Sequence, residues 1–325
     1  MSQVRVVSLL ILVLVLSGVS PQELLSQSGP FELRQQYAPD ALRLTGTAFR
    51  PQVREVGSSD LSLGVAWTST FAEKNSYRID EERVESRLRW RYGLSENIEG
   101  QIEIPVLWRG GGALDSFVDG WHDFFSLPEG GRDKAPQDDY FVSGVTTGGS
   151  SFELGESGMG LGNSIVSAKF QVLPEGEWSP ALGLRPSFSL PTASDQYGHD
   201  GVDAGIEASL SKQVFSLIVY GGGGIFFHPD REISGLRYEP AHGEGFLAAE
   251  YPILDSLDLV VSGIWSSEIV SNIQEHPHHL FSLDYGLVLR RESGGSLTFG
   301  MRENPSAQRG SADFSFFFEG SVPIG

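Results

Sequence analysis

Residues 83–106 read RVESRLRWRYGLSENIEGQIEIPV. Apolar side chains alternate strictly with charged or polar ones, so that Val84, Leu88 and Trp90 share one parity and the arginines take the other. Strict alternation predicts a β-strand with one apolar and one polar face. A helix would set Leu88 and Trp90 far apart and leave no apolar stripe to bury. The stretch therefore predicts a β-hairpin that turns between residues 93 and 97.

The same period of two extends along most of the chain. About twelve alternating segments can be marked, at residues 61–71, 84–92, 98–106, 166–172, 182–190, 202–210, 215–227, 243–251, 257–268, 279–290, 297–302 and 313–322. The connectors between them alternate between long and short, and transmembrane barrels join their strands by short periplasmic turns and longer outer loops. The prediction is an all-β, antiparallel up-and-down transmembrane β-barrel of about twelve strands, with both termini on the periplasmic side.

The polar face of the predicted strands carries charges of both signs. Pairing the first hairpin so that residue numbers sum to 190 sets Arg91 opposite Glu99 and Arg87 opposite Glu103, and opposite charges across a strand pair are favourable. A sum of 392 sets Arg185 opposite Glu207 in a later hairpin. We predict a lumen network of charged side chains: Arg87, Arg89, Arg91, Glu99, Glu103, Lys169, Arg185 and Glu207.

The first residues have the pattern of a secretory signal peptide. Arg5 precedes an apolar core at residues 6–16, and small residues follow. The core is shorter than the roughly 20 residues that a membrane-spanning helix requires. We expect a signal peptide over 1–28, cleaved between 17 and 28, then a periplasmic or plug-like segment over 29–57 and the barrel over 58–325, with a long outer loop at 110–162.

Composition excludes several classes of protein. The 325 residues include 23 Lys+Arg against 42 Asp+Glu, a formal net charge of −19, so a nucleic-acid partner is not expected. The absence of Cys excludes disulfides, thiolate catalysis, Cys-ligated zinc and iron–sulfur clusters. No cofactor, metal ion or catalytic residue is predicted.

The most distinctive motif lies in the long loop, where residues 119–136 read DGWHDFFSLPEGGRDKAP. It resembles the HD-aromatic-F-x-LP-x-GGRD-x-x-P signature of an uncharacterised Gram-negative outer-membrane family, domain-of-unknown-function family 3187. The matching positions are His122, Asp123, Phe124, Phe125, Leu127, Pro128, Gly130, Gly131, Arg132, Asp133 and Pro136. The resemblance implies a signal peptide and a barrel over most of the chain, and it implies no activity.

Two motifs have an alternative functional interpretation, and a third is interpreted structurally. His122 with Asp123, Asp119 or Ser126 could act as a general base in an outer-leaflet lipid enzyme, and nearby carboxylates could bind calcium, but a folded loop anchored by aromatic residues is favoured. For His276, His278 and His279 a solvated loop is favoured over a zinc site. The glycines at 221–224 indicate a kink, a bulge or the close approach of a plug.

The sequence thus predicts a bacterial outer-membrane barrel that acts as a narrow channel or structural barrel for small solutes and not as an enzyme. The alternatives are the outer-leaflet lipid-modifying enzyme and a soluble periplasmic β-sandwich or lipid carrier. The expected partners are outer-membrane lipid, lipopolysaccharide and, during biogenesis, the barrel assembly machinery. The oligomeric state is left open.

Overall fold

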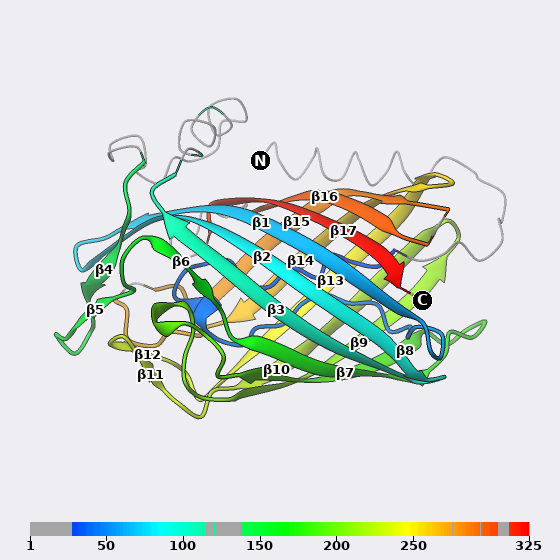
Figure 1. Ribbon diagram of the computed structural model, residues 1–325, viewed down its shortest axis with the longest axis horizontal. Coiled ribbons are helices and arrows are strands. Elements are labelled where there is room, and N and C mark those ends of the chain that lie inside the picture. The colour runs from blue at the N-terminus through cyan, green and yellow to red at the C-terminus, as the bar shows by residue number, and fades with distance from the viewer. Residues whose placement is uncertain are drawn as a thin grey trace.

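The computed structural model describes residues 28–112, 114, 120, 138–274, 276–292, 294–304 and 312–324. Twelve antiparallel strands close into one barrel (Figure 1). They are β1 (Ser59–Glu73), β2 (Tyr77–Ser95), β3 (Ile98–Gly110), β7 (Ser164–Leu173), β8 (Ala181–Leu190), β9 (Asp203–Val214), β10 (Leu217–Phe227), β13 (Ala241–Leu254), β14 (Leu257–Ser267), β15 (His279–Arg290), β16 (Ser296–Glu303) and β17 (Phe314–Ile324). The predicted fold class is confirmed.

The barrel is closed by its first and last strands. β1 pairs with β17 in an unbroken register from Ser59 opposite Ile324 to Ser69 opposite Phe314. Pairing around the whole circumference leaves no strand of the barrel with an unpaired edge. Every backbone group of a closed barrel can therefore be satisfied within the sheet, as a lipid environment requires.

Shorter elements lie at one end of the barrel. They are β4 (Phe141–Val145), β5 (Ser151–Glu153), β6 (Gly158–Leu161), β11 (Glu232–Ile233), β12 (Leu236–Arg237) and the 3-10 helices η1 (Asp40–Leu42) and η3 (Asp195–Tyr197). β4 continues the sheet from β2, and β6 continues it from β3. No helix in the described ranges is long and apolar enough to cross a membrane.

Connector length sorts the two ends of the barrel as predicted, except that the 74–76 connector is a short turn at the end with the long loops. One end carries the turns at 96–97, 174–180, 215–216, 255–256 and 291–295, and is called the short-turn end. The other, the long-loop end, carries the connectors at 74–76, 111–163, 191–202, 228–240, 268–278 and 304–313. Ser59 and Ile324, where the barrel strands begin and end, both lie at the short-turn end (Figure 1).

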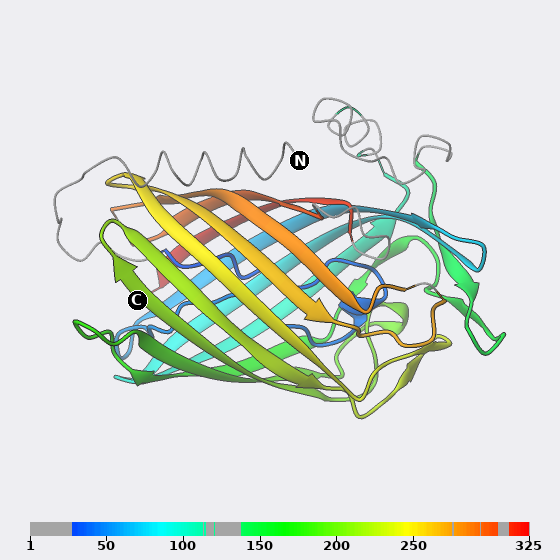
Figure 2. The ribbon, with the colours of Figure 1, turned by 180° about the vertical axis from the view of Figure 1, so that it is seen from behind.

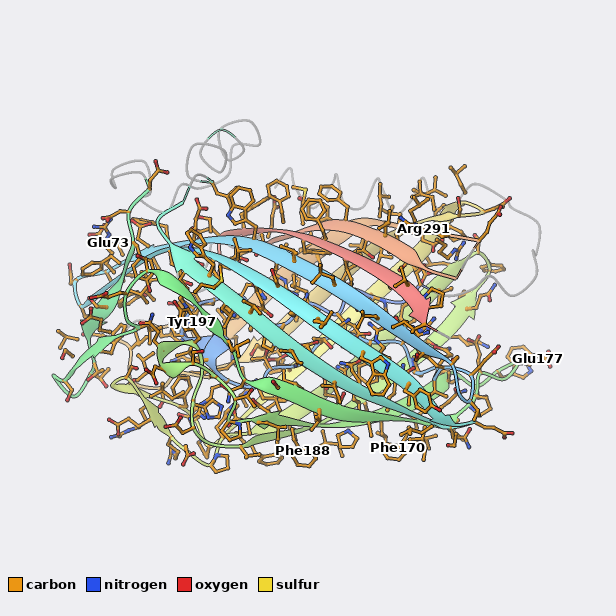
Figure 3. All side chains as sticks on the ribbon, in the orientation of Figure 1. Glu73, Phe170, Glu177, Phe188, Tyr197 and Arg291 are labelled. Atoms are coloured by element: carbon orange, nitrogen blue, oxygen red, sulfur yellow. The ribbon has the colours of Figure 1, made fainter. Side chains whose placement is uncertain are left out.

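The alternation of side chains places the apolar face outside and the polar face inside. Leu88, Trp90 and Ile104 are about 40 % exposed, whereas Arg89 and Glu103 on the opposite parity are almost fully buried. Phe170 and Phe188 likewise project from the outer surface in Figure 3. This arrangement is the inverse of that in a soluble sheet, and it is the one that a barrel in lipid requires.

One predicted register is confirmed and the other is wrong by two residues. Arg185 lies opposite Glu207, as predicted. In the first hairpin, however, Arg89 lies opposite Glu103 and Arg91 opposite Gln101. The turn contains only residues 96 and 97, and an irregularity between Gly93 and Ser95 shifts the pairing. The shift is even, so each side chain keeps its predicted face.

The outward face can be tested at the middle of β3. Ile104→Arg should lower the free energy of unfolding in lipid vesicles by about 2–4 kcal/mol if residue 104 lies at the bilayer midplane, because a lipid-facing charge is costly there. Ile104→Leu is the matched control, with a cost below about 1.5 kcal/mol. Equal stability of the two variants would contradict a lipid-facing position.

Candidate functional site

The N-terminal part of the described chain runs through the interior of the barrel (Figure 2). Residues 28–57, called here the lumen segment, contain no strand and add none to the sheet. The segment enters at the short-turn end, ascends to the long-loop end, turns at η1 and descends again. Most side chains between residues 30 and 49 are buried. The lumen is therefore occupied along its length by two extended legs of the same chain.

The ascending leg is anchored by polar contacts. The backbone N–H groups of Ser28 and Gly29 donate to the two carboxylate oxygens of Glu250, both at 2.9 Å. Farther up, Arg34 pairs with Glu103 on β3 at 3.0 Å and also donates to the carbonyl of Thr45 on the descending leg. Arg34 thus ties both legs to each other and to the wall.

The turn of the lumen segment is buried by apolar loops at the long-loop end. Tyr37, Ala38 and Leu42 belong to one cluster with side chains of β2, β4, β5 and the 228–240 and 268–278 connectors. The Tyr238 hydroxyl donates to the carbonyl of Pro39 at 3.0 Å. Apolar burial therefore fixes the top of the segment, and smaller apolar clusters at Phe31, Leu33 and Leu44 add to the polar contacts of the legs.

The descending leg contacts a wall of acids. The N–H of Gly46 donates to Glu244 at 2.9 Å, that of Thr47 to Glu207 at 3.1 Å, and that of Arg54 to Glu99 at 3.1 Å. The Arg185 guanidinium lies 4.0 Å from the centre of the Phe49 ring. These acids accept bonds from backbone groups that no strand partner satisfies.

A buried cluster centred on Asp203 joins the lumen segment to the barrel wall. Asp203 accepts bonds from Arg43 at 3.1 Å and from the Leu44 N–H at 3.0 Å, and it lies 3.1 Å from both His199 and His228. His228 then contacts His242 at 2.8 Å. His242 in turn contacts Glu244 at 3.0 Å, which completes a continuous path of polar contacts. No local motif in the sequence indicates this cluster, because its members come from distant positions.

The structure brings together the eight side chains of the lumen network. Arg89 pairs with Glu103 at 3.0 Å, Lys169 with Glu99 at 3.1 Å and Arg185 with Glu207 at 2.9 Å. Arg87 and Arg91 contact Glu32, a residue of the lumen segment that sequence reasoning missed. Each of these pairs joins neighbouring strands, except those to Glu32, which join the wall to the lumen segment.

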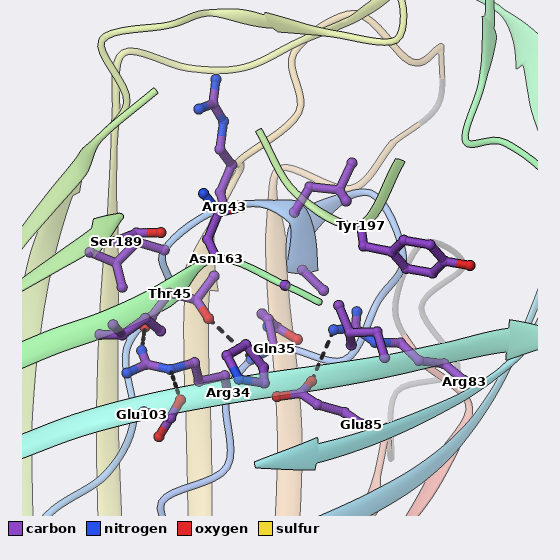
Figure 4. A pocket seen from close by; sticks show the side chains of 17 residues that line it. Arg34, Gln35, Arg43, Thr45, Arg83, Glu85, Glu103, Asn163, Ser189 and Tyr197 are labelled. Atoms are coloured by element: carbon purple, nitrogen blue, oxygen red, sulfur yellow. Dashed lines mark hydrogen bonds and ion pairs between the residues drawn. The ribbon is translucent and has the colours of Figure 1, made fainter. Parts of the chain in front are cut away.

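Two small cavities lie between the lumen segment and the wall. The first, of about 40 Å³, lies beside Arg34, Thr45, Arg83, Glu85 and Glu103 (Figure 4). The second, of about 70 Å³, is lined by Phe31, Glu32, Arg87, Arg91, Phe317 and Glu319. Each is large enough for only a few water molecules. Neither of these two cavities can admit a solute much larger than water.

The motif loop with His122, Asp123, Phe124, Phe125, Leu127, Pro128, Gly130, Gly131, Arg132, Asp133 and Pro136 lies outside the described residues. Of the 276–279 histidines, His278 and His279 are exposed as expected, but His276 is buried against Tyr37 with 5.6 Å between ring centroids. His278 is exposed and pairs with Glu268 at 2.6 Å. No group of three or more His, Asp or Glu in the described ranges is arranged to hold a metal ion.

The glycine run of β10 reflects a close approach by an aromatic ring. A Cβ added at Gly222 would lie 2.7 Å from the ring of Phe246 and 2.3 Å from the carbonyl oxygen of Ala208. Phe246 in turn packs against Phe49 of the lumen segment, with 6.5 Å between ring centroids. Gly222 thus makes room for the ring that supports the segment.

The closed twelve-strand barrel with an apolar exterior and a polar, charged interior defines the class of outer-membrane-type β-barrels. The chain belongs to the family described as protein of unknown function DUF3187, whose model matches residues 6–319. No curated protein matches the chain.

Solved structures share the fold at low sequence identity. The COG4313 outer membrane channel from Pseudomonas putida F1 matches with a TM-score of 0.59 and 12% identity, over 84% of this chain and 98% of that one. The NanC porin matches at 0.46 and 10% identity, over 81% and 98%. LpxR from Salmonella typhimurium matches at 0.43 and 10% identity, over 81% and 99%. Only the first likeness is strong enough to support the fold.

The Asp203 cluster can be tested by removing its central charge. Asp203→Asn should lower the free energy of unfolding by about 3–5 kcal/mol, because it leaves Arg43 buried without its acid. The double variant Asp203→Asn/Arg43→Met should lose less free energy of unfolding than the two single variants lose together. Urea unfolding of all four proteins in a double-mutant cycle measures this difference. The exposed Asp200→Asn is the control, with an effect within about 0.5 kcal/mol. Additive effects would contradict the coupling.

His276 makes the stability of the long-loop end depend on pH. Burial, together with the nearby His278, lowers the pKa of His276 from its ordinary 6.5 to about 4. Unfolding exposes the ring and restores its ordinary pKa, so the unfolded chain takes up the proton first as the pH falls. The free energy of unfolding is therefore at its full value above pH 6.5 and decreases by about 3 kcal/mol as the pH falls to about 4. Urea unfolding from pH 7 to 4 measures the slope. His276→Phe, which preserves the stacking, should flatten it, and an unchanged slope would contradict this origin.

Proposed function

We propose that the protein is a narrow outer-membrane channel for small solutes, closed in this state by the lumen segment. The observation that carries the proposal is the way the lumen is filled. The barrel wall is complete without the segment, and the segment is held mainly by side-chain contacts and by no β-ladder. A filler of this kind can leave the lumen without breaking any strand pairing.

The character of the wall supports a route for polar solutes. Inward positions carry arginines and carboxylates in ion pairs, and such a lining keeps water once the filler moves aside. The fold shared with a solved outer-membrane channel supports the same function. With twelve strands the barrel is larger than the small ones whose interior is filled by wall side chains alone, and smaller than the wide porins.

The alternatives receive less support. A lipid-modifying enzyme would require the His122 loop, which lies outside the described residues, and no described group favours that chemistry. A soluble sandwich or carrier conflicts with the single closed sheet. In our proposal the protein acts by binding and passage and catalyses no reaction. Its surroundings are outer-membrane lipid and lipopolysaccharide, and the barrel assembly machinery inserts it.

Removal of residues 29–57 tests the proposal. The deletion variant should conduct ions steadily in planar lipid bilayers and admit small sugars into liposomes, with a conductance above that of the full chain. The physical reason is that the segment fills the space between opposite walls. Heat-modifiable gel mobility would show that the variant barrel is folded. A folded deletion variant with neither conductance nor solute flux would refute the channel.

A crosslink provides the matched control. The chain has no Cys, so a single engineered disulfide is unambiguous. Gln52 of the lumen segment donates to the Ser211 hydroxyl at 3.0 Å. In the double variant Gln52→Cys/Ser211→Cys, oxidation should hold conductance at or below the level of the full chain, and reduction should restore that level.

A further inference from the structure

Glu32 of the lumen segment lies where several wall cations converge. Its carboxylate is 3.4 Å from Arg185 Nη1, 3.6 Å from Arg91 Nη2 and 3.8 Å from Arg89 Nη1. Its backbone carbonyl also accepts a bond from Arg87 at 2.7 Å. Four arginines from β2 and β8 therefore surround one residue of the segment. The sequence does not indicate this, because Glu32 lies in a stretch without strand periodicity.

Acids of the wall fix the direction of two of these guanidinium groups. Arg185 binds Glu207 through Nε and Nη2, both at 2.9 Å, and in the described structure its Nη1 has Glu32 as its acid partner. Arg89 binds Glu103 through Nε at 3.0 Å, and on the lumen side its Nη1 also contacts Glu319 of β17 at 3.3 Å. A guanidinium fixed through one edge presents its remaining N–H groups in a defined direction. The site is thus built by the wall and not by the segment.

Glu32 fills this site loosely. Distances of 3.4–3.8 Å exceed the roughly 2.7–2.9 Å of a charge-assisted hydrogen bond between a cation and a carboxylate. The side chain is tethered to a backbone that Arg87 already holds, so it cannot approach all three guanidinium groups. The 70 Å³ cavity lined by Glu32, Arg87 and Arg91 lies directly beside it. A free carboxylate has no tether and could approach more closely.

We propose that Arg89, Arg91 and Arg185 form a binding site for the carboxylate group of a small organic acid, and that Glu32 occupies this site as an internal substitute. This deepens the proposed function, on which it rests for the route by which the acid arrives. A solute carboxylate would compete with Glu32 and favour the state in which the lumen segment is displaced. Glu319 shares Arg89 and Arg91 with Glu32, so an incoming carboxylate takes the position of Glu32 beside Arg185 Nη1 and Arg91 Nη2.

The site can be tested without any transport measurement, by adding acetate to a full-length variant that lacks the Glu32 carboxylate. Glu32→Ala removes the substitute and should lower the temperature at which the folded, heat-modifiable barrel converts to the unfolded form. Sodium acetate should raise that temperature, with a half-saturating concentration at least about tenfold below that of acetamide, the ratio that one charge-assisted hydrogen bond provides. Sodium chloride at equal ionic strength should not reproduce the effect.

Two further variants complete the test. Glu32→Ala/Arg91→Met removes one of the three guanidinium groups and should weaken the acetate response several-fold, whereas Glu55→Ala removes an exposed carboxylate of the segment and should show no response. If Glu32→Ala does not fold, Glu32→Gln replaces it, with acetate entering the adjacent cavity. An equal response to acetate, acetamide and chloride would overturn the site. Failure of conductance with intact rescue would refute the channel and leave the carboxylate site standing.

Discussion

Charge compensation inside the barrel is the constraint on which the rest of the structure depends. Strand alternation turns every second residue inward, and a lipid exterior forces that inward set to be the polar one. A buried ion without a partner is strongly destabilising, so each arginine on β2 must find an acid. Arg89 finds Glu103 on the next strand, and Arg185 finds Glu207. The barrel wall is therefore arranged as cross-strand pairs, and its remaining bonding capacity faces the lumen.

The lumen segment completes that compensation. Arg34 reaches the second oxygen of Glu103, Glu32 lies among the wall arginines, and the N–H groups of Gly46 and Thr47 bind wall acids. The backbone N–H groups of the segment find their hydrogen-bond acceptors in the same wall carboxylates whose charge the segment helps to compensate. Its fold is consequently dictated by the wall. Apolar burial is most extensive at the top, where Tyr37 and Leu42 lie under the loops, and it continues along the legs in smaller clusters.

The period of two was enough to predict the barrel, the faces of its strands and the pairing of Arg185 with Glu207. It was not enough for the first hairpin, where the observed register differs from the predicted one by two residues while the parity is kept. The path of the lumen segment could not be predicted, because its contacts depend on side chains that the closed barrel gathers from distant strands. The Asp203 cluster was missed for the same reason, since His199, His228 and His242 share no spacing that indicates contact.

Both legs of the lumen segment leave the barrel at the same rim. Ser28 lies beside Glu250 and Asp258 near one short turn, and Arg54 pairs with Asp60 where β1 begins. Over residues 28–57 the segment is therefore a U-shaped loop whose two ends lie at one rim of the barrel. Because the loop adds no strand to the sheet, the wall can close before the loop enters, and movement of the loop breaks no strand pairing. Assembly of the barrel and occupation of its bore are thus topologically independent events.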